Sequence, residues 1–150
     1  MRARVSLNQK DLGTIMCDAR VARLATVDSE DCKPYLVPVV FIYDGNNFYI
    51  PVDEKTKRSK PENLKRVKNI HTNPNVALLI DEYNEDWKKI WFIMIQGNAS
   101  LINNTESKQN RLTQRVHRLL NEKYPQYLTT GIGKFCIMIR PQRVINWKNG

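Results

Sequence analysis

Hydrophobic residues occur along this chain in short runs that have the length and composition of β-strands. The runs at residues 35–43 and 48–52 are rich in β-branched and aromatic residues, and they flank Asp44-Gly45-Asn46-Asn47. Gly and Asn tolerate positive φ at little cost, so this pattern predicts a β-hairpin. Similar apolar runs predict further strands at residues 20–27, 76–80, 87–99, 135–140 and 144–147.

Three segments have apolar residues at helical spacing instead. A helix is predicted over residues 7–19, with Ser6 as N-cap and Gln9 completing a capping box. A second helix is predicted to start at Ser59 or Lys60 and to end near Asn73, because Pro74 disfavours a helical residue before it. A third is predicted over residues 105–121, followed by a turn-rich linker over residues 124–130.

Two features of the predicted strands bear on function. Pro38 interrupts the run at 35–43 and cannot donate a ladder hydrogen bond, so it marks an edge, a bulge or an opening of the sheet. The strand at 87–99 is apolar on both faces, which suggests that both are covered, one of them by a second subunit. Short strands, hairpin turns and no βαβ rhythm predict a mainly β, antiparallel barrel or sandwich with peripheral helices.

Composition narrows the class of protein. A chain of 150 residues with 41% hydrophobic and 26% charged residues is expected to form one domain, residues 1–150. No apolar run approaches the ~20 residues of a membrane helix, and the N-terminus has no signal-peptide pattern, so we expect a cytoplasmic protein without membrane association. Three scattered cysteines without CxxC spacing predict reduced thiols and no metal site.

The net charge of +9 fits an anionic partner, and it fits equally well an excess of solvated lysines. A cationic cluster lies between the hairpin and the second helix and contains Lys55, Lys57, Arg58 and Lys60. Cations beside a helix N-terminus form a good phosphate site. No nucleophile, metalloprotease, P-loop or dinucleotide motif occurs, so catalytic residues are not identified. A phosphate site with nearby aromatic residues suits a redox cofactor that carries its own reactivity.

The order of several segments resembles the pyridoxamine 5′-phosphate oxidase-like split-barrel superfamily, and most closely its branch of F420-dependent oxidoreductases. The segments that carry the resemblance are ARLATV at 22–27, YLVPVVF at 35–41, IPVDEKTKR at 50–58, NLKRVKNIHTNPNVALLID at 63–81, and the stretch from Asp86-Trp87 to QGNA at 96–99. The resemblance implies a six-stranded antiparallel split barrel in a homodimer, with two cofactor sites at the subunit interface.

The resemblance also implies which residues bind the cofactor, which is FMN or F420. The phosphate would be held by the cationic cluster, and the flat ring would lie along Pro38, Val39 and Val40, with Thr26 near the same pocket. Trp87, Trp91 and Trp147 are expected to come from the partner subunit. The arginine pattern of true pyridoxamine-phosphate oxidases is absent at the C-terminus, PQRVINWKNG.

The leading functional hypothesis is an F420-dependent oxidoreductase that transfers a hydride to a small unsaturated acceptor. F420 is favoured because seven of the sixteen residues from 53 to 68 are Lys or Arg and its tail is polyanionic. The alternatives are an FMN-dependent oxidase or reductase, and a non-catalytic binder of a flavin, a deazaflavin or haem. Nucleic-acid binding is disfavoured because the acidic segment 81–86 interrupts the basic charge.

Overall fold

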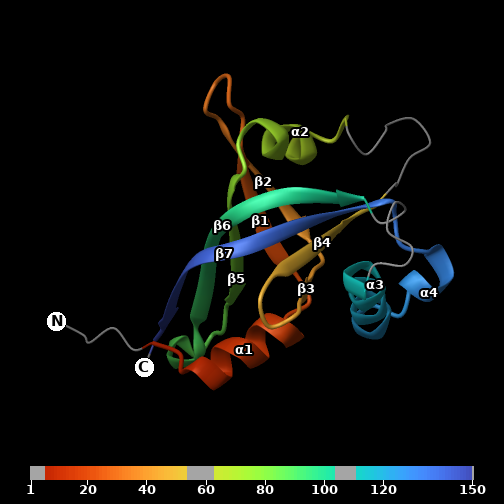
Figure 1. The fold of residues 1–150 in the computed structure, drawn as a ribbon. Coiled ribbons are helices and arrows are strands. Elements are labelled where there is room, and N and C mark those ends of the chain that lie inside the picture. The colour runs from red at the N-terminus through yellow and green to blue at the C-terminus, as the bar shows by residue number, and fades with distance from the viewer. Residues whose placement is uncertain (1–5, 54–62, 104–110, 150) are drawn as a thin grey trace.

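The computed structural model describes residues 6–53, 63–103 and 111–149, and these fold around one antiparallel sheet. The sheet has the strand order β2-β1-β5-β6-β7-β4-β3, and helices lie outside it (Figure 1). The mainly β, curled antiparallel architecture that the sequence predicts is therefore confirmed. The predicted number of strands is wrong, since the described residues contain seven and not six.

The curl of the sheet follows from the connection between its two edge strands. β2 (Pro34–Val39) and β3 (Ile42–Tyr43) lie at opposite ends of the strand order, yet only Val40 and Phe41 separate them. Such a connection spans at most roughly 10 Å, so the two edges must approach each other. The predicted single strand over 35–43 is therefore wrong: it splits where the chain passes between the edges. Pro38 lies on the edge strand β2, which confirms the edge interpretation.

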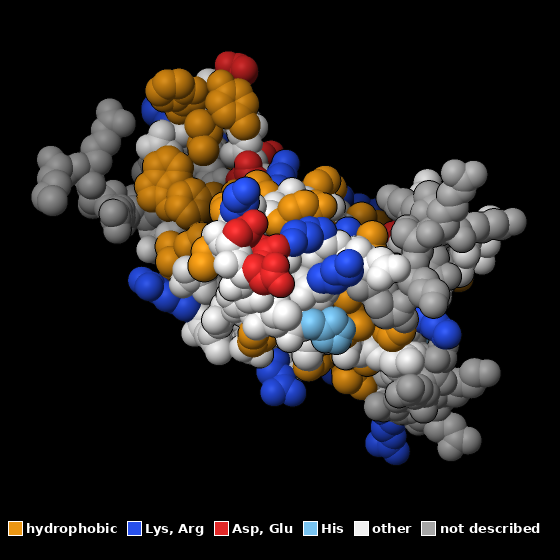
Figure 2. All heavy atoms as spheres, turned by 90° about the horizontal axis from the view of Figure 1, so that it is seen from above, with side chains coloured by type: hydrophobic (Ala, Val, Ile, Leu, Met, Phe, Trp, Pro, Cys, Tyr) orange, Lys and Arg blue, Asp and Glu red, His pale blue; other side chains and the backbone are white. Residues whose placement is uncertain are grey.

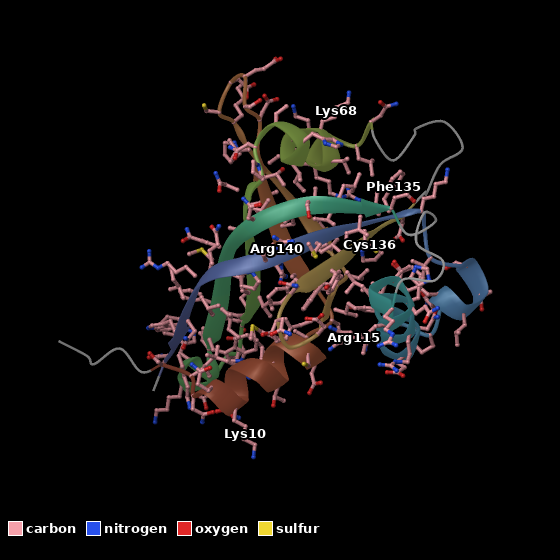
Figure 3. All side chains as sticks on the ribbon, viewed as in Figure 1. Lys10, Lys68, Arg115, Phe135, Cys136 and Arg140 are labelled. Atoms are coloured by element: carbon pink, nitrogen blue, oxygen red, sulfur yellow. The ribbon has the colours of Figure 1, made fainter. Side chains whose placement is uncertain are left out.

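The hairpin predicted around Asp44 is confirmed. β3 pairs with β4 (Phe48–Val52), and Gly45 has a φ of 96° in the turn between them. The Asp44 carboxylate accepts hydrogen bonds from the backbone N–H groups of Asn46 (2.9 Å) and Asn47 (2.7 Å). Arg115 lies on the side of α3 (Arg111–Lys123) that faces this hairpin (Figure 3), and its guanidinium donates to the Asp44 carbonyl at 2.9 Å.

The longest strands, β6 (Trp91–Asn103) and β7 (Phe135–Lys148), form a ribbon along the whole molecule (Figure 1). Two last strands broken at Pro141 were predicted, but β7 is continuous. A register shift between Gln96 and Gly97 places Pro141 opposite Gly97, so a β-bulge accommodates the proline. A Cβ on Gly97 would lie 2.5 Å from the Arg140 carbonyl oxygen, so this position requires glycine.

The remaining strands and the first two helices complete the main core. β1 (Ala22–Val27) pairs with β2 and with β5 (Asn75–Glu82), while α1 (Gln9–Asp18) and α2 (Lys65–Thr72) pack on the sheet. The predicted capping box is wrong, because Asn8 caps α1 and its side chain accepts from the Asp11 N–H. The predicted end of α2 at Asn73 is confirmed. Its predicted start at Ser59 or Lys60 lies outside the described residues, and α2 itself begins at Lys65.

Two short helices also differ from the sequence-based expectation. Residues 87–89, predicted as strand, form the 3-10 helix η2 (Trp87–Lys89), capped by the Asp86 carboxylate. The predicted linker contains α4 (Tyr127–Thr130). The third predicted helix exists as α3, which extends to Lys123, and the start of its predicted range, at 105–110, lies outside the described residues. α3 and α4 enclose a small second core against β3, β4 and β7, and this core includes Ile42, Tyr49, Val116, Leu120 and Cys136.

The two faces of β6 differ in burial. Ile93 and Ile95 are fully buried in the main core, whereas Phe92 and Met94 on the opposite face are half-buried. Figure 2 shows hydrophobic side chains gathered over one part of the surface seen from above. Cys17, Cys32 and Cys136 are free thiols. No helix among the described residues has the length and hydrophobicity needed to cross a membrane.

Candidate functional site

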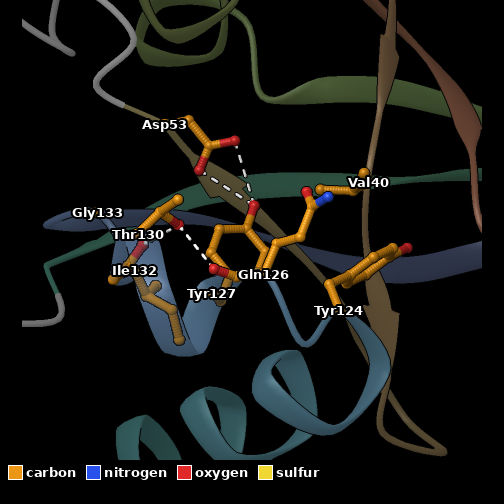
Figure 4. A pocket seen from close by; sticks show the side chains of 9 residues that line it. Val40, Asp53, Tyr124, Gln126, Tyr127, Thr130, Ile132 and Gly133 are labelled. Carbon is orange, nitrogen blue, oxygen red and sulfur yellow. Dashed lines mark hydrogen bonds between the residues drawn. The ribbon is translucent and has the colours of Figure 1, made fainter.

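A cavity of about 630 Å³ lies beside the two-residue connection between the edge strands β2 and β3, where the sheet is open, and between the end of β4 and the C-terminal part of α3 (Figure 4). Its volume is within the range of small-molecule and cofactor sites. The strand side contributes Val40 and Asp53, and the segment that follows α3 contributes the rest of the lining, Tyr124, Gln126, Tyr127, Thr130, Gly131, Ile132 and Gly133. We refer to it as the split cavity.

Phe41 lies in the connection between β2 and β3, outside both strands. Residues at the end of α3 supply the hydrogen-bond partners of its backbone. The Phe41 N–H donates to the Tyr124 hydroxyl at 3.2 Å, and Lys123 Nζ donates to the Phe41 carbonyl at 2.9 Å. The Tyr124 hydroxyl also lies 2.8 Å from the Arg20 carbonyl and 3.1 Å from the Phe41 carbonyl, as a donor. Buried backbone groups require such partners. Lys123 and Tyr124 therefore hold the two-residue connection on which Val40 lies.

A second tyrosine is anchored in the same wall by a carboxylate. The Tyr127 hydroxyl donates to the Asp53 oxygens, at 3.1 Å from Oδ1 and 3.2 Å from Oδ2 (Figure 4). Burial raises the pKa of Tyr127, and the adjacent Asp53 carboxylate raises this pKa further. Burial also raises the pKa of Tyr124. Both phenols are neutral at physiological pH, so they present polar but uncharged aromatic surfaces.

The loop after α4 closes the cavity by a close backbone approach. A Cβ on Gly133 would lie 2.4 Å from the Val52 carbonyl oxygen, so only glycine allows the loop to pass this near to β4. Gly131, Ile132 and Gly133 of this loop also form one wall of the split cavity.

The residues predicted to follow the cofactor ring lie at this split. Val40 lines the cavity, Val39 is buried at 8% exposure, and Pro38 is exposed on the edge strand. The predicted phosphate cluster, Lys55, Lys57, Arg58 and Lys60, lies outside the described residues. Asp53, two residues before Lys55 in the sequence, lines the cavity.

Thr26 is held inside the protein. Its side chain is fully buried, and its hydroxyl accepts a hydrogen bond from Asn69 Nδ2 of α2 at 3.0 Å. This contact fastens α2 to β1. In this chain Thr26 therefore lies in the core beneath α2 and does not line the split cavity.

The three predicted tryptophans lie at the other end of the β6–β7 ribbon. Asn103 pairs with Phe135, which pairs with Val52 next to the cavity, whereas Trp91 pairs with Lys148 at the far end. The 13 residues of β6 cover roughly 40 Å of strand. Trp147 stacks on Phe92 with ring centroids 6.0 Å apart, Trp91 Nε1 donates to Glu82, and Trp87 is 65% exposed. Within one chain these side chains do not reach the split cavity.

Sequence reasoning missed three lining residues, Tyr124, Gln126 and Tyr127, because it read their segment as a linker. A weak signal was available: two tyrosines three residues apart, beside Pro125, directly after an amphipathic helix. The identity of their partners was not available, since Phe41 and Asp53 are more than 70 residues away in the chain.

The lining can accept a flat, partly polar ring system. It combines the neutral phenols of Tyr124 and Tyr127, the Gln126 amide and the apolar side chains of Val40 and Ile132. Such walls bind an aromatic ring by packing and by hydrogen bonds. Among the described lining residues, Asp53 is the only one with an acidic or basic side chain that is charged at neutral pH. The arrangement therefore fits a cofactor ring, whose anionic part would have to lie outside this cavity.

Comparison with known proteins identifies relatives of the chain. A family model described as pyridoxamine 5′-phosphate oxidase matches residues 11–148. A search of curated proteins finds no match.

Solved structures of several proteins share the fold. An FAD-binding protein from Mesorhizobium loti has 17% sequence identity and a TM-score of 0.68, and the alignment covers 97% of each chain. A putative pyridoxamine 5′-phosphate oxidase from Listeria innocua has 22% identity and a TM-score of 0.61, with 91% of this chain and 95% of that chain covered. The haem storage protein HutZ from Vibrio cholerae has 14% identity and a TM-score of 0.69, with 95% and 94% covered. At these identities the similarity shows the fold.

Proposed function

Because the chain belongs to the pyridoxamine 5′-phosphate oxidase family, we propose that it is an oxidoreductase with a flavin-type cofactor bound at the split of the sheet. The observation that carries this proposal is the split cavity, which brings Val40 and the end of β4 together beside neutral aromatic walls. When bound, the cofactor supplies hydride transfer to a small unsaturated acceptor. The protein contributes binding, orientation and exclusion of water.

We assign F420 as the cofactor, with FMN as the alternative. The fold similarity to FAD-binding proteins from Mesorhizobium loti and Mycobacterium smegmatis supports a flavin-type ring. The seven Lys and Arg residues between 53 and 68 support a cofactor with more negative charge than a single phosphate. Lys55, Lys57, Arg58 and Lys60 would hold the phosphate, and the longer anionic tail of F420 would extend toward Lys68, which is exposed on α2. Lys65 on the same helix is paired with Asp28.

The described residues then have distinct roles. The connection that contains Val40 would lie along the ring, and its position depends on the hydrogen bonds from Lys123 and Tyr124 to Phe41. The Asp53–Tyr127 hydrogen bond holds the phenol against the end of β4. It also satisfies part of the hydrogen-bonding capacity of the Asp53 carboxylate, which keeps its negative charge, so the phosphate would have to lie toward the cationic cluster and away from Asp53.

A second copy of the chain would complete the site. The tryptophans lie at the end of the ribbon opposite the split cavity, so they can contribute to it only from another subunit. The half-buried face with Phe92, Met94 and Trp147 offers apolar surface for such a contact. We therefore propose a homodimer with the cofactor between subunits.

The test is a paired titration of the full-length apo protein with F420 and with FMN, followed by cofactor fluorescence and by tryptophan fluorescence. We expect saturable binding of both, with F420 at least tenfold tighter. Tighter binding of FMN would contradict the F420 assignment and favour an FMN-dependent enzyme. Haem, titrated in parallel and followed by its Soret band, tests the non-catalytic alternative. Binding of none of the three would overturn the cofactor assignment.

A double variant tests the phosphate cluster. Arg58→Ala with Lys60→Ala is expected to weaken F420 binding at least tenfold, because two charges near the phosphate are lost. Lys10→Ala with Lys33→Ala is the matched control, since it removes the same charge from two exposed positions away from the cavity. Equal affinity of the two double variants would contradict the placement of the phosphate. Circular dichroism of both variants checks that the fold is retained.

A further inference from the structure

A second cavity, of about 490 Å³, lies on the other side of the residues that hold Phe41. It is formed where the end of α1, the strand β3 and the C-terminal half of α3 meet, and we call it the α1–α3 cavity. Lys123 lines this cavity, while the next residue, Tyr124, lines the split cavity. The two cavities are therefore neighbours with different walls.

Two cations in the wall of the α1–α3 cavity have no acidic partner. Neither Arg20 nor Lys123 forms an ion pair with any described residue. Both instead contact aromatic rings: Arg20 Cζ lies 4.7 Å from the centre of the Tyr124 ring, and Lys123 Nζ lies 4.0 Å from that of Phe41. Asp18 and Glu122 lie in the same wall but form no ion pair with either cation, and holding two like charges close together without an ion-pair partner costs free energy that a bound anion would recover.

The state of Lys123 agrees with this geometry. Burial lowers the pKa of Lys123 to about 8, and the nearby Arg20 guanidinium contributes to the lowering. Within the described part of the chain, the Phe41 carbonyl is the one hydrogen-bond acceptor of its ammonium form, which has three N–H groups. An anion beside Lys123 would supply further acceptors and would oppose the repulsion from Arg20.

The remaining walls define which anion would fit. Ile42 and Leu119 provide an apolar surface, so the ligand should carry an apolar body. Asp18 and Glu122 also line the cavity and disfavour ligands with several negative charges. Glu122 lies 4.0 Å from Arg118, and Asp18 influences the pKa of Lys123 less than burial and Arg20 do, so neither carboxylate takes the place of a bound anion.

We propose that the α1–α3 cavity is a second binding site, for a small organic monocarboxylate whose apolar body packs on Ile42 and Leu119 and whose carboxylate lies between Arg20 and Lys123. The site is separate from the proposed cofactor site, and its existence does not depend on which cofactor the protein uses.

The experiment is isothermal titration calorimetry of the full-length protein with three probes of similar shape: 4-methylpentanoate, its neutral amide, and 3-methylbutylamine. We expect the carboxylate to bind at least tenfold more tightly than the amide and the amine not to bind. Equal binding of the carboxylate and the amide would overturn the proposal. So would the absence of carboxylate binding at about 50 mM, a concentration high enough to detect a very weak specific ligand.

Substitutions locate the binding. Arg20→Gln is expected to weaken the carboxylate at least fivefold, and Leu119→Asn is expected to weaken it by removing the apolar contact. Lys10→Gln is the control, because Lys10 is exposed on α1 and points away from the sheet (Figure 3). Unchanged affinity in Arg20→Gln would contradict the site. Thermal unfolding of each variant separates loss of the site from loss of the fold.

The pH dependence provides an independent readout. Affinity should fall as the pH rises from 7 to 9, because Lys123 loses its proton in this range. The other titratable or charged groups around it are Cys17, Asp18, Arg20, Tyr43 and Glu122. Because cysteine thiols as a class titrate in the same pH range as this lysine, the titration is made in Cys17→Ser. Lys123→Met should bind weakly at every pH. An affinity that does not change with pH in Cys17→Ser would contradict a contact between Lys123 and the carboxylate.

Discussion

The split cavity and the α1–α3 cavity are built on the same helix end but differ in charge. The split cavity has neutral phenols and one carboxylate in its described lining, whereas the α1–α3 cavity has two cations, Arg20 and Lys123, beside two carboxylates with which they form no ion pair. Consecutive helical residues point about 100° apart, so Lys123 and Tyr124 can serve opposite walls while both contact Phe41. Adjacent side chains on one rigid element can thus create two sites with different ligand chemistry.

The comparison also shows how the sites are mechanically linked. Phe41 has no strand partner at the split, so its backbone depends on Lys123 and Tyr124, whose side chains line the two cavities. A change in either residue therefore acts first on the connection between β2 and β3. The predictions below separate effects on the cavity walls from effects on this connection.

The largest effect is expected for Gly133→Ala. The added Cβ would lie 2.4 Å from the Val52 carbonyl oxygen, so the loop that closes the split cavity must move. We expect a loss of about 1–3 kcal/mol in the free energy of unfolding, measured with urea, and weaker cofactor binding. Carboxylate binding in the α1–α3 cavity should persist.

The control for this substitution is Gly13→Ala in α1, where a Cβ meets no atom within 4 Å. Alanine is a better helix residue than glycine, so this variant should be more stable by about 0.5–1 kcal/mol. Destabilisation of the two variants by equal amounts would contradict the close approach of Gly133 to β4.

The next effect is expected for Tyr124→Phe, which removes the hydroxyl shared by Phe41 and Arg20 while keeping the ring. The Phe41 N–H loses its partner, and we expect a loss of about 1–2 kcal/mol in urea unfolding. Tyr83→Phe is the control: its hydroxyl lies at the surface, 3.3 Å from Glu85, and its loss should change the same quantity by less than about 0.5 kcal/mol.

A smaller effect concerns Lys123 and pH. Its pKa in the folded protein is about 8, lower than the ordinary value of 10.5, so the unfolded chain binds its proton more tightly. The free energy of unfolding should therefore rise as the pH increases from 8 to 10, relative to Lys123→Met measured in parallel. Raised tyrosine pKa values act mainly above pH 10 and leave this window clear. A difference that falls with pH would contradict the burial of Lys123.

The smallest effect is expected for Arg118→Gln. Arg118 and Glu122 are exposed and 4.0 Å apart, and surface ion pairs of this kind contribute about 0–1 kcal/mol. Unfolding should change by less than about 0.5 kcal/mol. Because Glu122 loses its cation, carboxylate binding in the α1–α3 cavity should weaken slightly, by less than in Arg20→Gln. A larger change in binding than in Arg20→Gln would move the site toward the solvent side of α3.

Several elements followed from local sequence alone because their determinants are local. The Asp44–Asn47 turn, the edge position of Pro38 and the end of α2 before Pro74 depend on the φ preferences and missing donors of a few residues. The division of residues 35–43 into β2 and β3 was missed. The continuity of β7 was also missed, since a proline usually ends a strand. Here a β-bulge next to Pro141 keeps β7 paired with β6. The residues around the proline in the sequence give no sign of this pairing.

By itself, the sequence determined the mainly β class and the hairpin, which follow from periodicity and turn residues, and its ordered motifs already resembled the family to which the chain belongs. Only the tertiary structure decided that the two sheet edges meet at Phe41 and that Tyr124, Tyr127 and Asp53 share a wall. It alone also brought Arg20 and Lys123 into one wall where, among the described residues, neither forms an ion pair. These contacts join residues more than 70 positions apart, and long-range pairing depends on how the whole sheet curls.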